Sequence, residues 1–376
     1  MLKPQWCLDR AKRMRHLIVP SVATQHWLDE IKSRDWLELG IGVLTMENGM
    51  KAIPLNNMAP VSTDQIWQSL AHIEIVRDRE SVKHWTDLLD RDLYQSLKDY
   101  WPRAYEVVGD IIILKLEPEV YPHRDKIGKA MLERNPNVRL VCADNGVHGE
   151  FRVRNLLPII SRDGSTETLT RIRENGHNIL VDPTKSYFSS RLSTERLGNL
   201  NSAKTLAHQL NRSLTICDPY AGVGPSFANL ISEENLVAKV LAGDLNPQAV
   251  SLLEQNIEHY INKSPGDISC VVLCQDARLW QNSPNYQKSV DFLLVNLPHS
   301  TVEHLGELFP LMRRETVTLI RGWAIIGRGE LSAIETKLSN LFSLHGATDL
   351  QLTCHEIKGF SASKVFIRIE SWQTFV

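Results

Sequence analysis

The clearest alternation of apolar and polar segments lies in the C-terminal half of the chain. Apolar runs rich in β-branched residues are separated there by amphipathic stretches, and segment 246–263 carries its apolar side chains at helical spacing. Strands that alternate with helices predict a parallel, doubly wound sheet. Two later apolar runs, 349–357 and 363–372, flank a Gly-containing turn and predict an antiparallel hairpin at the sheet's edge. The runs that predict the parallel strands are SLTICDPY, KVLAGDL, ISCVVLCQDA and VDFLLVNLP.

The N-terminal half is less regular. Residues 104–180 contain short alternating runs with turn residues between them, which predicts a small mixed domain with several strands. Upstream, segment 26–37 is helix-like, and apolar runs around Asn48-Gly49 are typical of a β-hairpin. We therefore predict an α/β protein of three domains: an N-terminal α/β domain at 1–70, a mixed α+β domain at 71–180 and a catalytic domain at 181–376.

Composition excludes few functions. A length of 376 residues suits several domains, and a net charge of −2 gives no global sign of nucleic-acid binding, although a local basic patch suffices to contact phosphates. No apolar run approaches the roughly 18 residues of a membrane span, and no secretory leader is recognised. We expect a soluble, cytoplasmic monomer with no membrane partner. The basic cluster at 10–15 is typical of a solvated helix face.

The cysteines indicate a reducing compartment. Six are present without a CxxC pair, and several lie in apolar runs. Buried thiols are therefore expected, and no metal site.

A glycine-containing turn follows the first strand of the C-terminal half. That strand ends at Asp218, and the next residues place Gly222 and Gly224 where the backbone can approach a ligand closely. A tight strand-to-helix turn that binds no ligand can have the same Gly-x-Gly pattern. The loop alone therefore does not decide between a ligand site and a plain turn.

Polar residues at the ends of three further strands strengthen the ligand hypothesis. Asp244 ends the second strand, 26 residues after Asp218, where a carboxylate can accept hydrogen bonds from ribose hydroxyls. Asp276 ends the third strand and can meet an adenine amino group, and Asn296 ends the fourth. We expect all four side chains to face one crevice.

The loop favours S-adenosylmethionine over other nucleotide cofactors. A dinucleotide-binding loop would carry Gly or Ala where Phe227 stands, and a P-loop would need Gly-Lys-Ser or Gly-Lys-Thr, which is absent. A bulky loop with acidic neighbours suits a cationic sulfonium cofactor, which needs no phosphate cradle. The sequence therefore predicts a methyltransferase.

Together the motifs resemble a known family. DPYAGVGPSF, GDLNPQAV, QDAR and VNLPH, with the upstream YEVVGDIIIL, HGEFRVRN, RENG and KSYFSSRLSTER, are similar to the tRNA (guanine-37-N1)-methyltransferases of archaea and eukaryotes. The likeness runs from about residue 105 to the C-terminus, and 1–70 looks like the family's extra tRNA-binding domain. Ser190 replaces the family's usual proline, and GWAIIGRGE lacks aromatic residues common there. The resemblance implies a class I methyltransferase fold, S-adenosylmethionine as cofactor and the tRNA anticodon loop as substrate.

The resemblance also implies which residues form the site. The catalytic residues that it implies are Tyr187, Arg191, Glu195, Arg152 and Asn296. Together with the strand-end argument, it gives the expected cofactor-binding residues Asp218, Gly222, Gly224, Asp244, Asn246, Asp276, Asn296 and Pro298.

Methylation of guanine N1 defines what these residues must do. N1 carries a proton at neutral pH, so the reaction needs a base, for which Glu195 is the candidate. Arg152 can donate to O6, where negative charge accumulates, and Asn296 can hold the purine edge. Because N1 lies on the Watson–Crick edge, the base must be splayed out of the anticodon loop.

The residues alone leave alternatives open. Arg191 and Glu195, four apart on a predicted helix, are typical of an exposed ion pair, and Tyr187 and Phe188 of core aromatics. A wybutosine-pathway aminocarboxypropyl transferase shares the fold and the tRNA substrate. It typically has a Gly-Asn pair in place of Arg191 and a longer NLGLLP-like run in place of NLP. A dual enzyme that also methylates a tricyclic guanosine intermediate and a catalytically silent RNA-binding protein are further alternatives.

Overall fold

The computed structural model of the protein describes residues 11–38, 42–46, 48–78, 84–151 and 153–376. They form two compact units, divided between Ser96 and Leu97. Among the described helices, none is long and apolar enough to cross a membrane.

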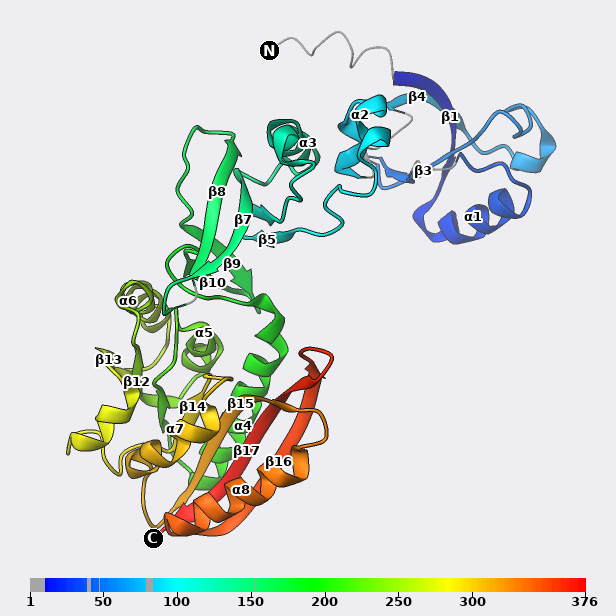
Figure 1. Ribbon diagram of the computed structural model, residues 1–376. Helices are drawn as coiled ribbons and strands as arrows, with labels where there is room; N and C mark the ends of the chain where they lie inside the picture. Colours follow the sequence, from blue (N-terminus) through cyan, green and yellow to red (C-terminus); the bar gives the residue numbers. More distant parts are fainter. Residues whose placement is uncertain (1–10, 39–41, 47, 79–83, 152) are drawn as a thin grey trace. The chain divides into compact units, whose positions relative to one another are not determined.

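The N-terminal unit is built on an antiparallel sheet in the order β2-β3-β1-β4, of which Figure 1 labels β1, β3 and β4. The predicted hairpin is confirmed: β2 pairs with β3, and Gly49 adopts a φ of 78° in the turn between them. Trp27 of α1 and Trp67 pack in the core of this unit. Its elements are β1 (Ala11–Val19), α1 (Thr24–Ser33), β2 (Leu44–Thr45), β3 (Lys51–Pro54), β4 (His72–Asp78) and α2 (Arg91–Ser96).

One expectation for this unit is corrected. The basic cluster at 10–15 was expected on a helix face, but its described residues lie in β1, which pairs with β3 on one side and β4 on the other. The same pairing carries the sheet past residue 70, because β4 belongs to it. The division of the chain into three domains stays a prediction.

The second unit begins with a smaller sheet, in the order β5-β6-β7-β8, and a separate hairpin of β9 and β10. All six strands fall in the region where short strands were predicted. β6 and β7 are parallel because α3 crosses between them. The elements are β5 (Glu106–Val108), β6 (Ile111–Leu114), α3 (Arg124–Arg134), β7 (Leu140–His148), β8 (Val153–Ser161), β9 (Thr170–Glu174) and β10 (His177–Val181).

The rest of this unit is a seven-stranded sheet, in the order β13-β12-β11-β14-β15-β17-β16. The first five strands in this order are parallel, and β17 runs antiparallel between β15 and β16, which confirms the predicted sheet and its hairpin. The strands are β11 (Leu214–Asp218), β12 (Val237–Asp244), β13 (Ser269–Cys274), β14 (Phe292–Val295), β15 (Val317–Gly327), β16 (Ala347–Gly359) and β17 (Lys364–Phe375).

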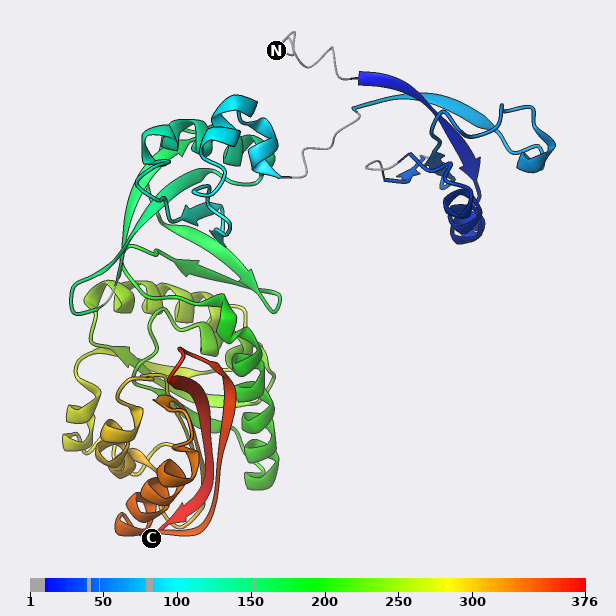
Figure 2. The ribbon, with the colours of Figure 1, turned by 45° about the vertical axis from the view of Figure 1, so that its right-hand side comes forward.

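Helices cover both faces of this sheet, as Figures 1 and 2 show. α4 (Ser193–Leu210), α5 (Pro225–Ser232) and α6 (Pro247–Ile261) bury their apolar sides on one face. α7 (Thr301–Leu308) and α8 (Leu331–Leu344) do so on the other. β11 and β14 are buried along their whole length, so apolar residues do not alternate with exposed polar ones; β14 is wholly apolar, and β11 is polar only at the buried Thr215 and Asp218.

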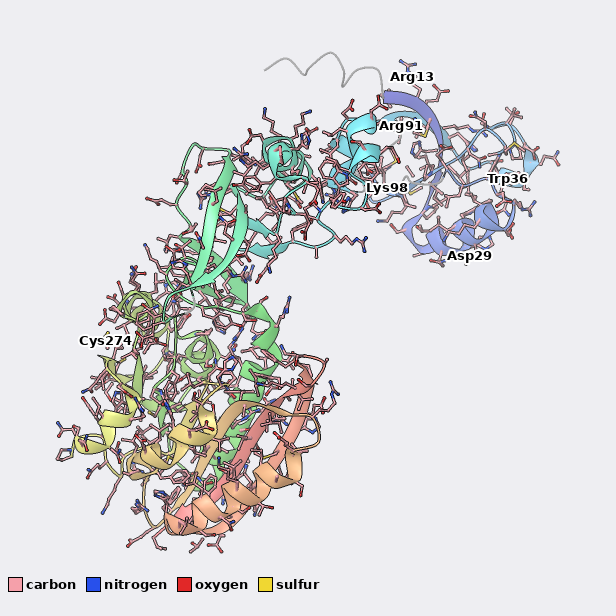
Figure 3. All side chains as sticks on the ribbon, viewed as in Figure 1. Arg13, Asp29, Trp36, Arg91, Lys98 and Cys274 are labelled. Carbon is pink, nitrogen blue, oxygen red and sulfur yellow. The ribbon has the colours of Figure 1, made fainter. Side chains whose placement is uncertain are left out.

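The cysteine prediction holds only in part. Cys142 and Cys217 are buried as expected, but Cys270 and Cys274 are exposed. Both lie on β13, an edge strand of the sheet, where Figure 3 labels Cys274. An apolar run on an edge strand therefore does not bury every side chain. Cys7 lies outside the described residues.

Candidate active site

A cavity of about 400 Å³ lies at the carboxyl ends of β11 to β14. The strand order reverses between β11 and β14, which is where open α/β sheets bind ligands. The segment that enters α4 and the turn between β7 and β8 form its other walls. The lining residues from these two walls are Tyr187, Phe188, Ser189, Leu192, Arg196, Glu150 and Phe151.

The two glycines of the loop after β11 have different roles. Both have positive φ, 56° at Gly222 and 75° at Gly224, which residues with a side chain rarely adopt. Gly222 lines the cavity. A Cβ on Gly224 would lie 2.5 Å from Cδ1 of Leu253, so this glycine lets the loop pack against α6. The contact of Gly224 with a cofactor stays a prediction, because Gly224 is absent from the cavity lining but lies in the same loop as Gly222.

Asp244 ends β12 and lines the cavity. Its carboxylate accepts hydrogen bonds from the N–H groups of Gly222 and Asn246, each over 2.9 Å and each at a different oxygen. Burial raises the pKa of Asp244, and these two N–H groups oppose the shift. A carboxylate oxygen accepts more than one hydrogen bond, so Asp244 keeps capacity for hydroxyls in the cavity.

Asp276 is paired with a residue that the sequence did not single out. Nη2 of Arg278 lies 2.6 Å from its Oδ2, and both residues line the cavity. The hydrogen bonds from Arg278 lower the pKa of Asp276. If an adenine amino group binds Asp276 as expected, it must therefore share the carboxylate with Arg278.

Asn246, Asn296 and Tyr187 lie in the cavity wall as expected. Asn246 joins two walls, because its Oδ1 caps α6 and its Nδ2 donates to the carbonyl of Lys185 over 2.7 Å. Tyr187 is 63% exposed, so it is not a core aromatic.

Asp218 and Pro298 do not line the cavity. Asp218 is 3% exposed and accepts the N–H of Tyr220, which turns the carboxylate back under the loop. Burial raises its pKa to about 7, against the hydrogen bond from Tyr220, and the nearby charge of Asp244 adds to the rise. Pro298 uses its carbonyl to accept the N–H of Ile325. The expectation that all four strand-end side chains face one crevice is therefore wrong at Asp218.

Glu195 lies in the first turn of α4, between the lining residues Leu192 and Arg196, but is itself 7% exposed and absent from the lining. Nε1 of Trp323 donates to its Oε2 over 3.0 Å, and Nη1 of Arg368 lies 3.4 Å from both carboxylate oxygens.

The other two predicted catalytic residues are Arg191 and Arg152. Arg191 is exposed, does not line the cavity and forms no ion pair with any residue that the structure describes. The interpretation of Arg191 and Glu195 as an exposed ion pair is therefore wrong. Arg152 lies outside the described residues.

Three further contacts at the cavity wall are not predicted from the sequence. The hydroxyl of Tyr220 lies 2.8 Å from Nδ1 of His304, and both line the cavity. Arg196 forms a buried ion pair with Glu174, and its guanidinium lies 5.4 Å from the ring centre of Phe188. The first two contacts join distant parts of the chain, and no local pattern marks such pairs.

The lining suits a nucleoside more than a phosphate. Asp244 and Asp276 offer acceptors, and Leu245 and Ala277 offer apolar surface for a flat ring. The cation beside them, Arg278, is already paired with Asp276. No cluster of His, Cys, Asp or Glu among the described residues is arranged to hold a metal ion.

Comparisons with known proteins agree with this geometry. Residues 170–321 match the TRM5/TYW2 methyltransferase domain, and residues 85–163 match the TYW2 N-terminal domain. The chain is 32% identical over 214 residues to the tRNA (guanine(37)-N(1))-methyltransferase Trm5b of Pyrococcus abyssi, a match that covers 56% of this chain and 58% of that protein. For the relatives from Vitis vinifera and Arabidopsis thaliana the match spans 33% and 31% of their length.

Solved structures share the fold along nearly the whole chain. The crystal structure of Trm5b from Pyrococcus abyssi aligns with a TM-score of 0.66 and 22% identity, and covers 96% of this chain and 100% of that one. The complex of aTrm5 with tRNALeu aligns with a TM-score of 0.64 and 20% identity, over 96% and 99% of the two chains. Residues 170–321 of the chain therefore form a TRM5/TYW2 methyltransferase domain.

Proposed function

We propose that the protein is an S-adenosylmethionine-dependent tRNA (guanine-37-N1)-methyltransferase that acts in the cytoplasm as a monomer. One cavity joins the strand ends at Asp244 and Asn296 to the segment at Tyr187, and this observation carries the proposal. The name of the Pyrococcus abyssi relative and the tRNA in the aTrm5 complex support the choice of substrate.

The strand ends would hold the cofactor. The free lone pairs of Asp244 would accept the ribose hydroxyls, and Leu245 and Ala277 would contact the adenine ring. S-adenosylmethionine, when bound, supplies an electrophilic methyl group. The sharp turn at Gly222 brings backbone rather than a side chain to this part of the cavity.

The segment that enters α4 would hold the base. Tyr187 is exposed at the cavity and can cover a splayed-out guanine, while Asn296 holds its edge. Glu195 would take the N1 proton, directly or through one water molecule, because its neighbours Leu192 and Arg196 already line the cavity. Arg152 would stabilise the charge that develops on O6.

The test is a methyl-transfer assay on defined RNA. Two tRNA transcripts that differ only in carrying G or A at position 37 are incubated with the protein and labelled S-adenosylmethionine. The nucleosides are then separated by chromatography. We expect 1-methylguanosine from the first transcript and no labelled nucleoside from the second. Equal labelling of both transcripts would reject the proposed target.

The match of residues 85–163 to the TYW2 N-terminal domain keeps a second function in view. An aminocarboxypropyl transferase would move another group of the same cofactor onto tRNA. Arg191 and the NLP run at Asn296 favour methyl transfer. Cofactor labelled only in the methyl group, compared with cofactor labelled only in the amino-acid carbon chain, separates the two reactions, because each label reaches the tRNA in one reaction alone.

A further inference from the structure

A buried network of charged residues surrounds Glu195. β15 and β17 are antiparallel neighbours, and their register places Arg321 opposite Glu370 and Trp323 opposite Arg368. Residues two apart on a strand point to the same face, so all four side chains share the face that α4 covers. α4 adds one carboxylate to this cluster, that of Glu195 in its first turn.

Arg321 connects the two carboxylates of the network. Its Nη2 lies 3.6 Å from Oε2 of Glu195, and its Nε lies 3.1 Å from Oε2 of Glu370. Arg321 is 1% exposed, whereas Arg368 keeps 29% of its side-chain surface. Burial lowers the pKa of Arg321, and Glu370 opposes that shift. Because water screens Arg368 but not Arg321, the buried guanidinium acts on Glu195 through a lower dielectric.

The helix makes room for this guanidinium. A Cβ on Gly198 would lie 2.9 Å from both Nη1 and Nη2 of Arg321. Glycine in a helix interior costs about 1 kcal/mol relative to alanine, so its presence here needs a packing reason. The close approach of Arg321 supplies that reason.

The charges around Glu195 balance only when it is anionic. From β15 and β17 it faces Arg321 and Arg368, and Glu370 offsets one of them. On its own helix Arg196 is neutralised by Glu174. Protonation of Glu195 would therefore leave the network with an excess buried positive charge, which is unfavourable.

We propose that Arg321 is a positioning residue for the methyl transfer, which acts through Glu195 by holding its carboxylate anionic and fixed beside the cavity. The inference rests on the proposed function. In this arrangement Trp323 sets the direction of the carboxylate, and Arg321 supplies the buried positive charge beside it.

The test compares Arg321→Met with Arg321→Lys. Single-turnover rates of 1-methylguanosine formation are measured from pH 5 to 9, with S-adenosylmethionine and a G37 transcript at saturation. Loss of the cation removes its support for the anionic carboxylate. We therefore expect the acidic limb of the pH–rate profile to move up by about 1 pH unit in Arg321→Met. Lysine keeps the charge and should restore most of the wild-type profile.

The matched control is Arg313→Met. Arg313 also pairs with a buried carboxylate, that of Asp291, but neither residue lines the cavity. This variant should lose stability and keep the wild-type acidic limb. An unshifted limb in Arg321→Met, or an equal shift in Arg313→Met, would overturn the proposal.

A second variant tests the network if Arg321→Met fails to fold. Gly198→Ala keeps every charge and improves helix propensity, but its Cβ must displace the guanidinium. We expect the acidic limb to move in the same direction, and an unchanged limb would overturn the proposal. Failure of the proposed function is recognised separately, because the wild-type protein would then form no 1-methylguanosine at any pH.

Discussion

The indole N–H of Trp323 donates a hydrogen bond to Glu195 over 3.0 Å, across 128 residues of sequence. The donor lies on β15 and the acceptor on α4, so the contact forms only when the helix is seated on the sheet. The orientation of the candidate base therefore depends on the packing of α4 against β15. Substitutions of the base, of the cofactor contact and of packed positions should each have a distinct effect.

Glu195→Gln should lower the rate of methyl transfer by about 10²- to 10⁴-fold, the usual contribution of a general base. Glutamine keeps the shape but does not accept the proton. The dissociation constant for S-adenosylmethionine, measured by calorimetry, should stay unchanged, because Glu195 does not line the cavity. Glu233→Gln is the control, since Glu233 pairs with Lys204 at the surface. Wild-type activity in Glu195→Gln would remove Glu195 from the role of base.

Asp244→Ala should weaken S-adenosylmethionine binding by about 10-fold or more, the equivalent of one lost charge-assisted hydrogen bond. Alanine also leaves the N–H groups of Gly222 and Asn246 without their acceptor. The control is Asp267→Ala, because Asp267 is exposed and lies outside the cavity. The same dissociation constant for both variants would contradict the ribose contact.

Gly224→Ala should destabilise the protein by about 2 to 4 kcal/mol. Left-handed backbone costs a residue with a Cβ about 1 kcal/mol or more, and overpacking against Leu253 adds about 1 to 3 kcal/mol. Gly266→Ala is the control, since a Cβ there meets only the Ser264 hydroxyl, at 4.0 Å. Chemical denaturation measures both, and equal free energies of unfolding would show that Gly224 is not needed for packing.

Asp218→Asn should change how stability depends on pH. The pKa of Asp218 is about 7 in the folded protein, above the value of 3.8 for a free side chain, so the folded state holds the proton more tightly. Its stabilising contribution is complete below pH 4 and is lost as pH rises through 7.

At pH 8 the buried charge of Asp218 should cost the wild type up to about 4 kcal/mol, the equivalent of three pKa units. Asparagine removes that charge and keeps an acceptor for Tyr220. The variant should therefore unfold at a higher temperature than the wild type at pH 8, and at nearly the same temperature at pH 4. A difference of the same size at both pH values would contradict the buried charge as its cause.

Much of the fold follows from local pattern. The helical spacing in 246–263 marks α6, and the apolar runs mark β11 and β14, because burial imposes these periods on each element separately. Strand ends in a parallel sheet share one edge, so Asp244, Asp276 and Asn296 were placed correctly from their position in the sequence alone.

The charged residues around Glu195 could not be predicted from the sequence. Arg368 and Glu370 alternate with apolar residues in β17, a pattern that also fits an exposed strand face. Only the register of β17 against β15, and the helix above them, shows that these charges surround Glu195. Asp218 was misplaced for a related reason, since the direction of one side chain after a strand depends on the loop and not on the strand.

β17 is synthesised last but lies between β15 and β16 in the sheet, so the surroundings of Glu195 are completed only at the end of synthesis. Once residue 327 has been synthesised, all five parallel strands and the cofactor loop exist, yet the cation on β17 that faces Glu195 has still to be added to the chain. Until residues 364–375 enter the sheet, β15 has an open edge, and Glu195 faces Arg321 without Arg368 and Glu370. A nascent chain can thus contain every strand of the cofactor pocket before Glu195 has all of its charged neighbours.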